Sequence, residues 1–208
     1  MAGYGKATNP GRRRPGFARS GTAVVTALVL AACGGSGTKP PSSSTSTRTN
    51  AQFIAPAGTV KSSDGSFATT VPTGFTDETS SAHGGAVKVL YLAVGPRIDN
   101  QTININVFRE AAAGRTDINA ITAAELTGVR ALMPHAHSFS PVSALTVGGA
   151  LARSVDYQGL PGDQLLHLRQ VFVLHGGWIY TITYTALPNT YQAHVGAVDE
   201  LIGRWIWS

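Results

Sequence analysis

Apolar and polar positions alternate most regularly in the second half of the chain, and this pattern predicts an antiparallel meander. The predicted strands are 145–147, 150–157, 166–175 and 178–185. Gly-Gly pairs follow the first and third of these strands, and a two-residue Gly-Gly loop is a strong hairpin signal. The loop at 176–177 sets a register that pairs His175 with Trp178, Val173 with Tyr180, Val171 with Ile182 and Arg169 with Tyr184.

This register divides the last hairpin into two apolar faces. One face carries Val171, Val173, Trp178, Tyr180 and Ile182, and the other carries Leu166, Leu168, Phe172, Leu174 and Ile179. Because neither face suits water, we expect a layer to cover each of them. A final helix can supply one layer, with Asn189 or Thr190 as its N-cap. Its apolar residues recur at helical spacing: Tyr191, Val195, Val198, Ile202 and Trp205.

The first half of the domain is predicted to hold three strands and one helix. The strands are 65–72, which ends at a proline, 86–94, and 103–108, where Ile103, Ile105 and Val107 alternate with neighbours on the other face. Thr122 and Glu125 match the capping box that begins a helix, with Ile121 and Leu126 at the positions of a hydrophobic staple. Leu126, Val129 and Met133 form the apolar stripe of this helix, and Pro134 ends it.

The N-terminus has the order of an export signal. Arg12, Arg13, Arg14 and Arg19 precede the apolar run 21–30, which is too short to span a bilayer. The run leads to Leu30-Ala31-Ala32-Cys33, which contains the single cysteine of the chain and resembles the lipobox of bacterial lipoproteins. This resemblance implies a signal peptide at 1–32 and a lipid-modified Cys33, which would anchor the protein in the cell membrane on its extracytoplasmic face.

Composition and charge distinguish a predicted tether from a predicted folded domain, and they argue against nucleic acid as a partner. Residues 33–58 are rich in Gly, Ser, Thr and Pro and predict a flexible tether, whereas 59–208 has enough apolar residues for one folded domain. The net charge of +5 comes from the predicted signal peptide, because five of the sixteen basic residues and none of the eleven acidic residues precede Cys33. The remainder is neutral, which argues against a nucleic-acid partner.

A family resemblance supports the same architecture. The chain has Val-Pro-x-Gly-Phe at 71–75, the late hairpin Arg-Gln-Val-Phe-Val with Gly-Trp-Ile-Tyr-Thr-Ile-Thr-Tyr-Thr-Ala, and a closing amphipathic helix. In pattern and order, 59–208 resembles the PsbP-like superfamily, and most of all the LpqN-type lipoproteins of actinobacteria. The resemblance implies an α+β fold in which an antiparallel sheet lies between helices, an α/β/α sandwich. It also implies an accessory or binding role at the envelope and carries no shared catalytic set.

Few residues suggest catalytic chemistry. The chain lacks a Gly-x-Ser-x-Gly motif, its only cysteine is assigned to lipid, and its Gly-Gly pairs lie between strands. His135 and His137 would share a face of an extended segment and could ligate a metal if His83, His167, His175 or His194 joined them. The alternative is that both are solvent-facing histidines after a helix-ending proline.

An aromatic row is the second candidate site. Trp178, Tyr180 and Tyr184 either form core beneath the last helix or line an apolar groove for an acyl chain or glycan, with Arg169 or His175 at its mouth. We therefore expect a membrane-anchored, non-enzymatic binding module of the envelope, serving a lipid or a protein partner and without a cofactor. The alternatives are an envelope hydrolase or metal-dependent enzyme that uses His135 and His137, and a purely structural surface protein.

Overall fold

The computed structural model describes residues 58–82 and 88–208. The predicted signal peptide, Cys33, His83 and all of the predicted tether except Gly58 lie outside these ranges. No helix among the described residues is long and apolar enough to cross a membrane.

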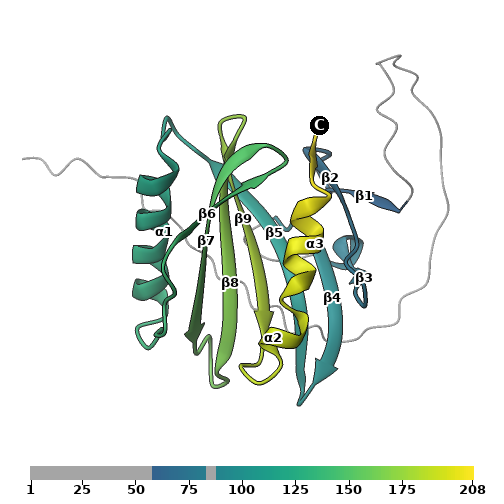
Figure 1. Ribbon diagram of the computed structural model, residues 1–208, viewed down its shortest axis with the longest axis vertical. Helices are drawn as coiled ribbons and strands as arrows, with labels where there is room; N and C mark the ends of the chain where they lie inside the picture. The colour runs from purple at the N-terminus through teal and green to yellow at the C-terminus, as the bar shows by residue number, and fades with distance from the viewer. Residues whose placement is uncertain (1–57, 83–87) are drawn as a thin grey trace, which may run out of the picture.

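In the described part of the chain, the main sheet is antiparallel and has seven strands, and Figure 1 shows their arrangement. In spatial order they are β3 (Thr76–Asp77), β4 (Tyr91–Ile98), β5 (Gln101–Ala111), β9 (Trp178–Ala186), β8 (Leu166–His175), β7 (Ala150–Gly159) and β6 (Ser143–Val147). The predicted pairing of β8 with β9 is confirmed at all four residue pairs. Both residues of each Gly-Gly loop have positive φ, which is the conformation that two-residue type I′ turns require.

Strand β4 differs from its prediction, which placed it at 86–94. Within the described residues it begins at Tyr91 and runs to Ile98, where a tight turn leads into β5. That turn consists of Asp99 and Asn100, both with positive φ. Asp and Asn adopt the left-handed backbone conformation more readily than most other residues do. The Asp99-Asn100 pair was therefore a signal for a two-residue hairpin, and the sequence analysis missed it.

A second, three-stranded sheet packs on one face of the main sheet. It consists of β1 (Thr59–Lys61), β2 (Phe67–Thr70) and the C-terminal β10 (Ile206–Trp207), with β2 in the middle. The fully buried Phe67 joins this sheet to the core and stacks on Trp205 with ring centroids 3.9 Å apart. The predicted strand 65–72 is therefore shorter than expected, and its pairing with the C-terminus was not foreseen. A short 3-10 helix, η1 (Thr79–Ser81), follows β3.

Helix α1 (Ile118–Leu132) covers β7 and β8 on the opposite face. The predicted capping box is wrong, because Asp117 is the N-cap and accepts a hydrogen bond from the Asn119 backbone N–H. Thr122 and Glu125 instead lie inside the helix, where both are buried. The C-terminal end before Pro134 agrees with the prediction.

The final segment forms two short helices, α2 (Tyr191–His194) and α3 (Gly196–Gly203), and not one long helix. Trp205 lies beyond α3 and packs against β2. The predicted N-cap position Thr190 is correct, although its hydroxyl donates to the Leu187 carbonyl and does not cap the helix. With α1 on one face and α2–α3 on the other, the α+β sandwich is confirmed (Figure 1).

Two hydrophobic cores follow the two predicted faces of the last hairpin. Val171, Val173, Tyr180 and Ile182 belong to the α3 side. Leu166, Leu168, Phe172 and Ile179 belong to the α1 side. On β9 the α1 side also carries Thr181, Thr183 and Thr185 after Ile179, and all three threonines are buried.

Candidate functional site

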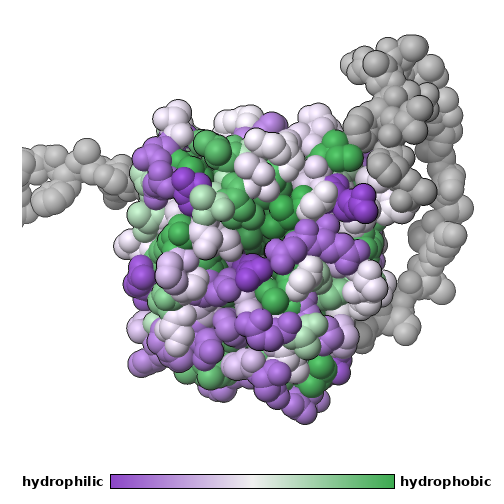
Figure 2. All heavy atoms as spheres, in the orientation of Figure 1, coloured by the Kyte–Doolittle hydropathy of each residue, from purple (hydrophilic) through white to green (hydrophobic). Residues whose placement is uncertain are grey.

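A pocket opens between α3 and the outer strands of the main sheet. Its volume is about 360 Å³, which is within the usual range for small-molecule sites. The lining residues come from the 140–141 loop, β6, β7, β8 and α3: Ser140, Pro141, Ser143, Leu145, Ser154, Asp156, Arg169, Val171, Asp199 and Ile202. Figure 2 shows a hollow beside α3 in which apolar side chains are bordered by a polar band.

Strand register explains why this surface is amphipathic. Residues that pair across neighbouring strands point to the same face of the sheet. The pairs on the α3 face are Ser143 with Ser154, Ser154 with Val171, and Asp156 with Arg169. Val171 is fully buried and extends the main core beneath the pocket. The serines, Asp156 and Arg169 share this face with Val171, so the pocket has an apolar base and polar groups around it.

Arg169 is held in place by two carboxylates. Its Nε donates to Asp156 Oδ1 at 2.9 Å and its Nη2 donates to Asp156 Oδ2 at 3.2 Å, which is a bidentate pair. Its Nη1 also lies 3.5 Å from Oδ1 of Asp199. The hydrogen bonds to Asp156 raise the pKa of Arg169, so the guanidinium remains charged. One positive and two negative formal charges leave the pocket with a net negative charge.

A group of packed rings, from His167, Tyr184 and Tyr191, lies beside Arg169. The His167 ring stacks on the Tyr191 ring with centroids 3.5 Å apart, and the Tyr184 hydroxyl donates to the Tyr191 carbonyl at 3.3 Å. Burial raises the pKa of Tyr184 and lowers the pKa of His167, so both side chains are uncharged at neutral pH. Tyr184 is fully buried and therefore forms core, not a groove wall.

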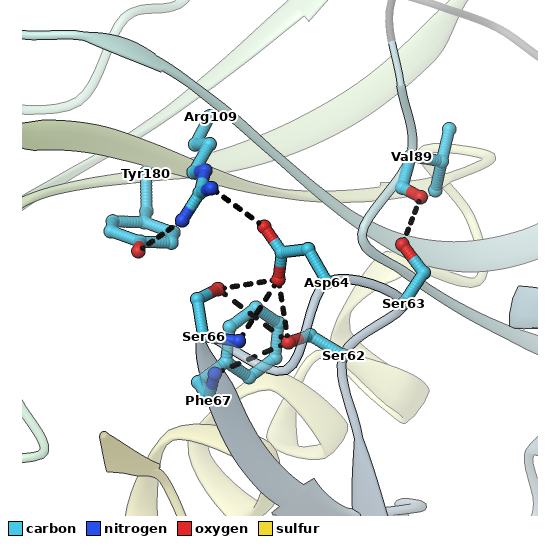
Figure 3. Close-up of polar contacts among 8 residues, drawn as sticks. All are labelled: Ser62, Ser63, Asp64, Ser66, Phe67, Val89, Arg109 and Tyr180. Atoms are coloured by element: carbon cyan, nitrogen blue, oxygen red, sulfur yellow. Dashed lines mark hydrogen bonds and ion pairs between the residues drawn. The ribbon is translucent and has the colours of Figure 1, made fainter. Parts of the chain in front are cut away.

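Tyr180 lies at a separate polar cluster (Figure 3), and Trp178 packs against the arginine of that cluster. Arg109 on β5 forms an ion pair with Asp64 at 3.0 Å and donates to the Tyr180 hydroxyl at 3.2 Å. Its guanidinium carbon lies 4.1 Å from the ring centroid of Trp178, which is 37% exposed. Tyr180 is buried. Of the four predicted groove residues, only Arg169 lines the pocket.

The carboxylate in this cluster fixes the β1–β2 loop to the main sheet. Asp64 accepts hydrogen bonds from the Ser66 backbone N–H and from the Ser66 and Ser62 hydroxyls. Burial disfavours its charged form, but these hydrogen bonds and the charge of Arg109 outweigh burial and lower the pKa of Asp64. Through Asp64 and Arg109, the cluster thus connects the β1–β2 loop to β5 and β9 of the main sheet.

The two candidate metal ligands are solvent-exposed. His137 makes a 2.8 Å hydrogen bond through Nδ1 with the Ser138 hydroxyl, and its backbone forms a bridge with Gln158. His135 is also exposed. Across residues 58–82 and 88–208, no group of three or more His, Cys, Asp or Glu side chains is placed to hold a metal ion.

Apart from Arg169, the polar pocket residues were missed in the sequence, although one signal was available. Ser154 and Asp156 alternate in β7 with the buried Val155 and Tyr157, so a polar face on a strand between apolar neighbours was visible. Asp199 lies on α3, far from the other polar pocket residues in the sequence. Its 3.5 Å approach to Arg169 depends on how α3 crosses the sheet, which no local pattern reveals.

Comparison with solved structures finds the same fold at low sequence identity. LpqN of Mycobacterium tuberculosis, described as involved in cell envelope biogenesis, is 15% identical with a TM-score of 0.54, over 67% of this chain and 82% of LpqN. The cyanobacterial PsbP of Synechocystis sp. PCC 6803 is 11% identical with a TM-score of 0.51, over 77% of this chain and 98% of that protein. No family model and no curated protein matches the chain. At these identities the likeness concerns architecture alone, and the chain has the fold of LpqN and of the cyanobacterial PsbP.

Proposed function

We propose that this chain is a lipoprotein of the cell envelope that acts as a non-enzymatic binding module. Its Cys33 would carry the lipid, 34–58 would hold the domain away from the membrane, and the pocket beside α3 would receive the ligand. The observation that carries the proposal is the pocket itself, because it combines an apolar base with fixed polar groups at its border. Sites of this form bind molecules that have both an apolar and a polar part.

Two further observations support the envelope setting. The order of arginines, apolar run and Leu-Ala-Ala-Cys in the sequence is typical of an exported lipoprotein. The fold is shared with LpqN, whose described involvement is in cell envelope biogenesis. A lipid with a neutral polar group would place its chain over Leu145, Val171 and Ile202 and its polar end toward the serines and charged residues.

Lipid binding is tested with the fragment 59–208, after circular dichroism has shown that it folds. A dansyl-labelled undecanamide should bind with a blue shift of the dansyl emission, because the pocket is less polar than water. Trp178 and Trp205 do not line the pocket, so the probe is a better reporter than the native indoles.

Matched variants assign the signal to the pocket. Ile202→Asn should weaken binding of the dansyl probe about tenfold, since it places a polar group against the acyl chain. Leu160→Asn, an exposed apolar residue in the β7–β8 turn, is the control and should not change the affinity. Equal affinities for both variants and the parent would contradict lipid binding at this pocket. A native mass spectrum of the full chain from its own membrane then shows whether a lipid copurifies.

A further inference from the structure

Strand β6 is an open edge of the main sheet. It is the last strand in the spatial order, and within residues 58–82 and 88–208 the strand that pairs with it is β7. In a two-residue hairpin the residues beside the loop, Val147 and Ala150, exchange hydrogen bonds, and the pattern then alternates along the strand. The backbone N–H and C=O groups of Ala144 and Thr146 therefore point away from β7, toward solvent. Both residues are exposed.

This edge lacks the features that normally prevent another strand from adding to it. The strand Ser-Ala-Leu-Thr-Val contains no charged residue, no proline and no bulge. The opposite edge is β3, which has only two residues, one of them an aspartate. Large apolar side chains are also exposed beside β6. Val142, which precedes β6, is 46% exposed, and Leu151, which pairs with Thr146, is 63% exposed.

The open edge and the pocket adjoin each other. Ser143 and Leu145 belong to β6 and line the pocket from its side. Neighbouring strands lie about 4.8 Å apart, so a strand added to β6 would place every second side chain at the pocket rim. The pocket carries a net negative charge, and the Asp199 side chain is 72% exposed with a single 3.5 Å contact to Arg169. A lysine or arginine on the added strand would complement that charge.

From this arrangement we infer that β6 is the docking site for an extended segment of a partner protein, which adds as an eighth strand. Main-chain hydrogen bonds to Ala144 and Thr146 hold the segment, and a basic side chain directed toward Asp199 and Asp156 selects it. A second copy of this chain fits less well, because its own β6 would bring no basic residue to the pocket. The inference rests on the proposed function, because it identifies a class of protein partner for the pocket beside α3.

The inference is tested with the full chain in phosphatidylcholine nanodiscs and two fluorescein-labelled ten-residue peptides. In the first peptide Thr alternates with Lys, and in the second Glu replaces every Lys. Fluorescence anisotropy should show binding of the lysine peptide alone. Thr146→Pro should weaken this binding about tenfold or more, because it removes an outward N–H and obstructs the edge. Thr146→Val keeps the backbone donor and should bind within about twofold of the parent.

A second pair of variants isolates the charge. Asp199→Asn should weaken binding of the lysine peptide about threefold and reduce its salt dependence, as expected for an exposed carboxylate at an interface. Asp163→Asn removes an exposed carboxylate in the β7–β8 turn and should have no effect. Circular dichroism and a melting curve establish that each variant is folded.

The following results would overturn the inference that a partner strand adds to β6. Equal binding of the two peptides, or equal effects of Thr146→Pro and Thr146→Val in folded proteins, would overturn strand addition at β6. Concentration-dependent dimerisation of the parent that Thr146→Pro abolishes would show that the occupant is a second copy. If the dansyl probe binds the pocket while the lysine peptide does not, the inference fails and the proposed function stands.

Discussion

The buried acid Glu125 offers a sharp test of the structure. Its positive neighbour, Arg115, does not fully offset the free-energy cost of burying a charged carboxylate. The Glu125 side chain is 6% exposed, and its Oε1 lies 3.5 Å from Nη1 of Arg115. Arg115 is shared with Glu110, whose Oε1 lies 2.5 Å from Nη2 of Arg115. Burial and the negative charge of Glu110 raise the pKa of Glu125 from an ordinary 4.5 to about 7, although Arg115 opposes the rise.

The sign of the stability change follows from proton binding. Between pH 4.5 and about 7, folded Glu125 holds a proton that the unfolded chain has released. The free energy of unfolding therefore decreases as the pH rises through this window. At about 1.4 kcal/mol per pH unit, the two pKa values set an upper limit of about 3 kcal/mol on the loss. Glu125→Gln imitates the protonated form and should avoid most of this loss.

The assay is urea unfolding of the parent and of Glu125→Gln at several pH values from about 4.5 to 8. His167 has a lowered pKa, so it contributes a change of the opposite sign as the pH rises toward 6.5. It is present in both proteins, and the difference between the two curves removes it. The variant should gain stability relative to the parent as the pH rises. Parallel curves would refute the reasoning.

A control distinguishes burial of Glu125 from a general effect of the cluster. Glu110→Gln removes the neighbouring negative charge that raises the pKa of Glu125. This variant should therefore retain a smaller pH-dependent loss, over a narrower window that still begins near pH 4.5 but ends at a lower pH. An unchanged window would show that the charge of Glu110 does not influence Glu125.

Three further predictions concern the anchor and the core. Cys33→Ala should abolish labelling by a fatty acid, and label retained by the variant would contradict lipidation at this residue. Gly148→Ala should lower the free energy of unfolding by about 1–3 kcal/mol, because the added Cβ would lie 2.7 Å from Trp207 Nε1. Gly149 is the control, since it also has a positive φ but faces open space. Gly149→Ala should lower the free energy of unfolding by about 1 kcal/mol. Leu201→Ala, at a fully buried position of α3, should cost about 2–5 kcal/mol by urea unfolding, and a cost below about 1 kcal/mol would mean that α3 does not complete the core.

The main hairpin could be predicted because its information is local. The Gly176-Gly177 loop permits the turn, and a two-residue turn leaves one register for β8 and β9. Period-two alternation then assigned Val171 and Phe172 to opposite cores. The end of α1 before Pro134 was predictable for the same reason, since proline acts on the residues next to it.

Where local signals compete, the sequence was ambiguous. Thr122 and Glu125 have the spacing of a capping box, yet Asp117 caps α1 and begins the helix earlier. Both residues lie on a buried face of the helix, where Glu125 meets Arg115 of the loop that precedes α1. A residue's pairing partner in three dimensions is absent from the pattern, so a cap and a buried ion pair look alike in one sequence.

The sequence by itself determined the fold class, the antiparallel pairing at the centre of the sheet and the division of residues between its two faces, because turns and periodicity act over a few neighbouring positions. Only the tertiary structure decided that Tyr180 and Tyr184 are core and that Arg169 meets Asp156 and Asp199 at a pocket. Asp199 is thirty positions from Arg169 in the chain. Its position depends on how α3 crosses the sheet, which is set by the packing of whole layers.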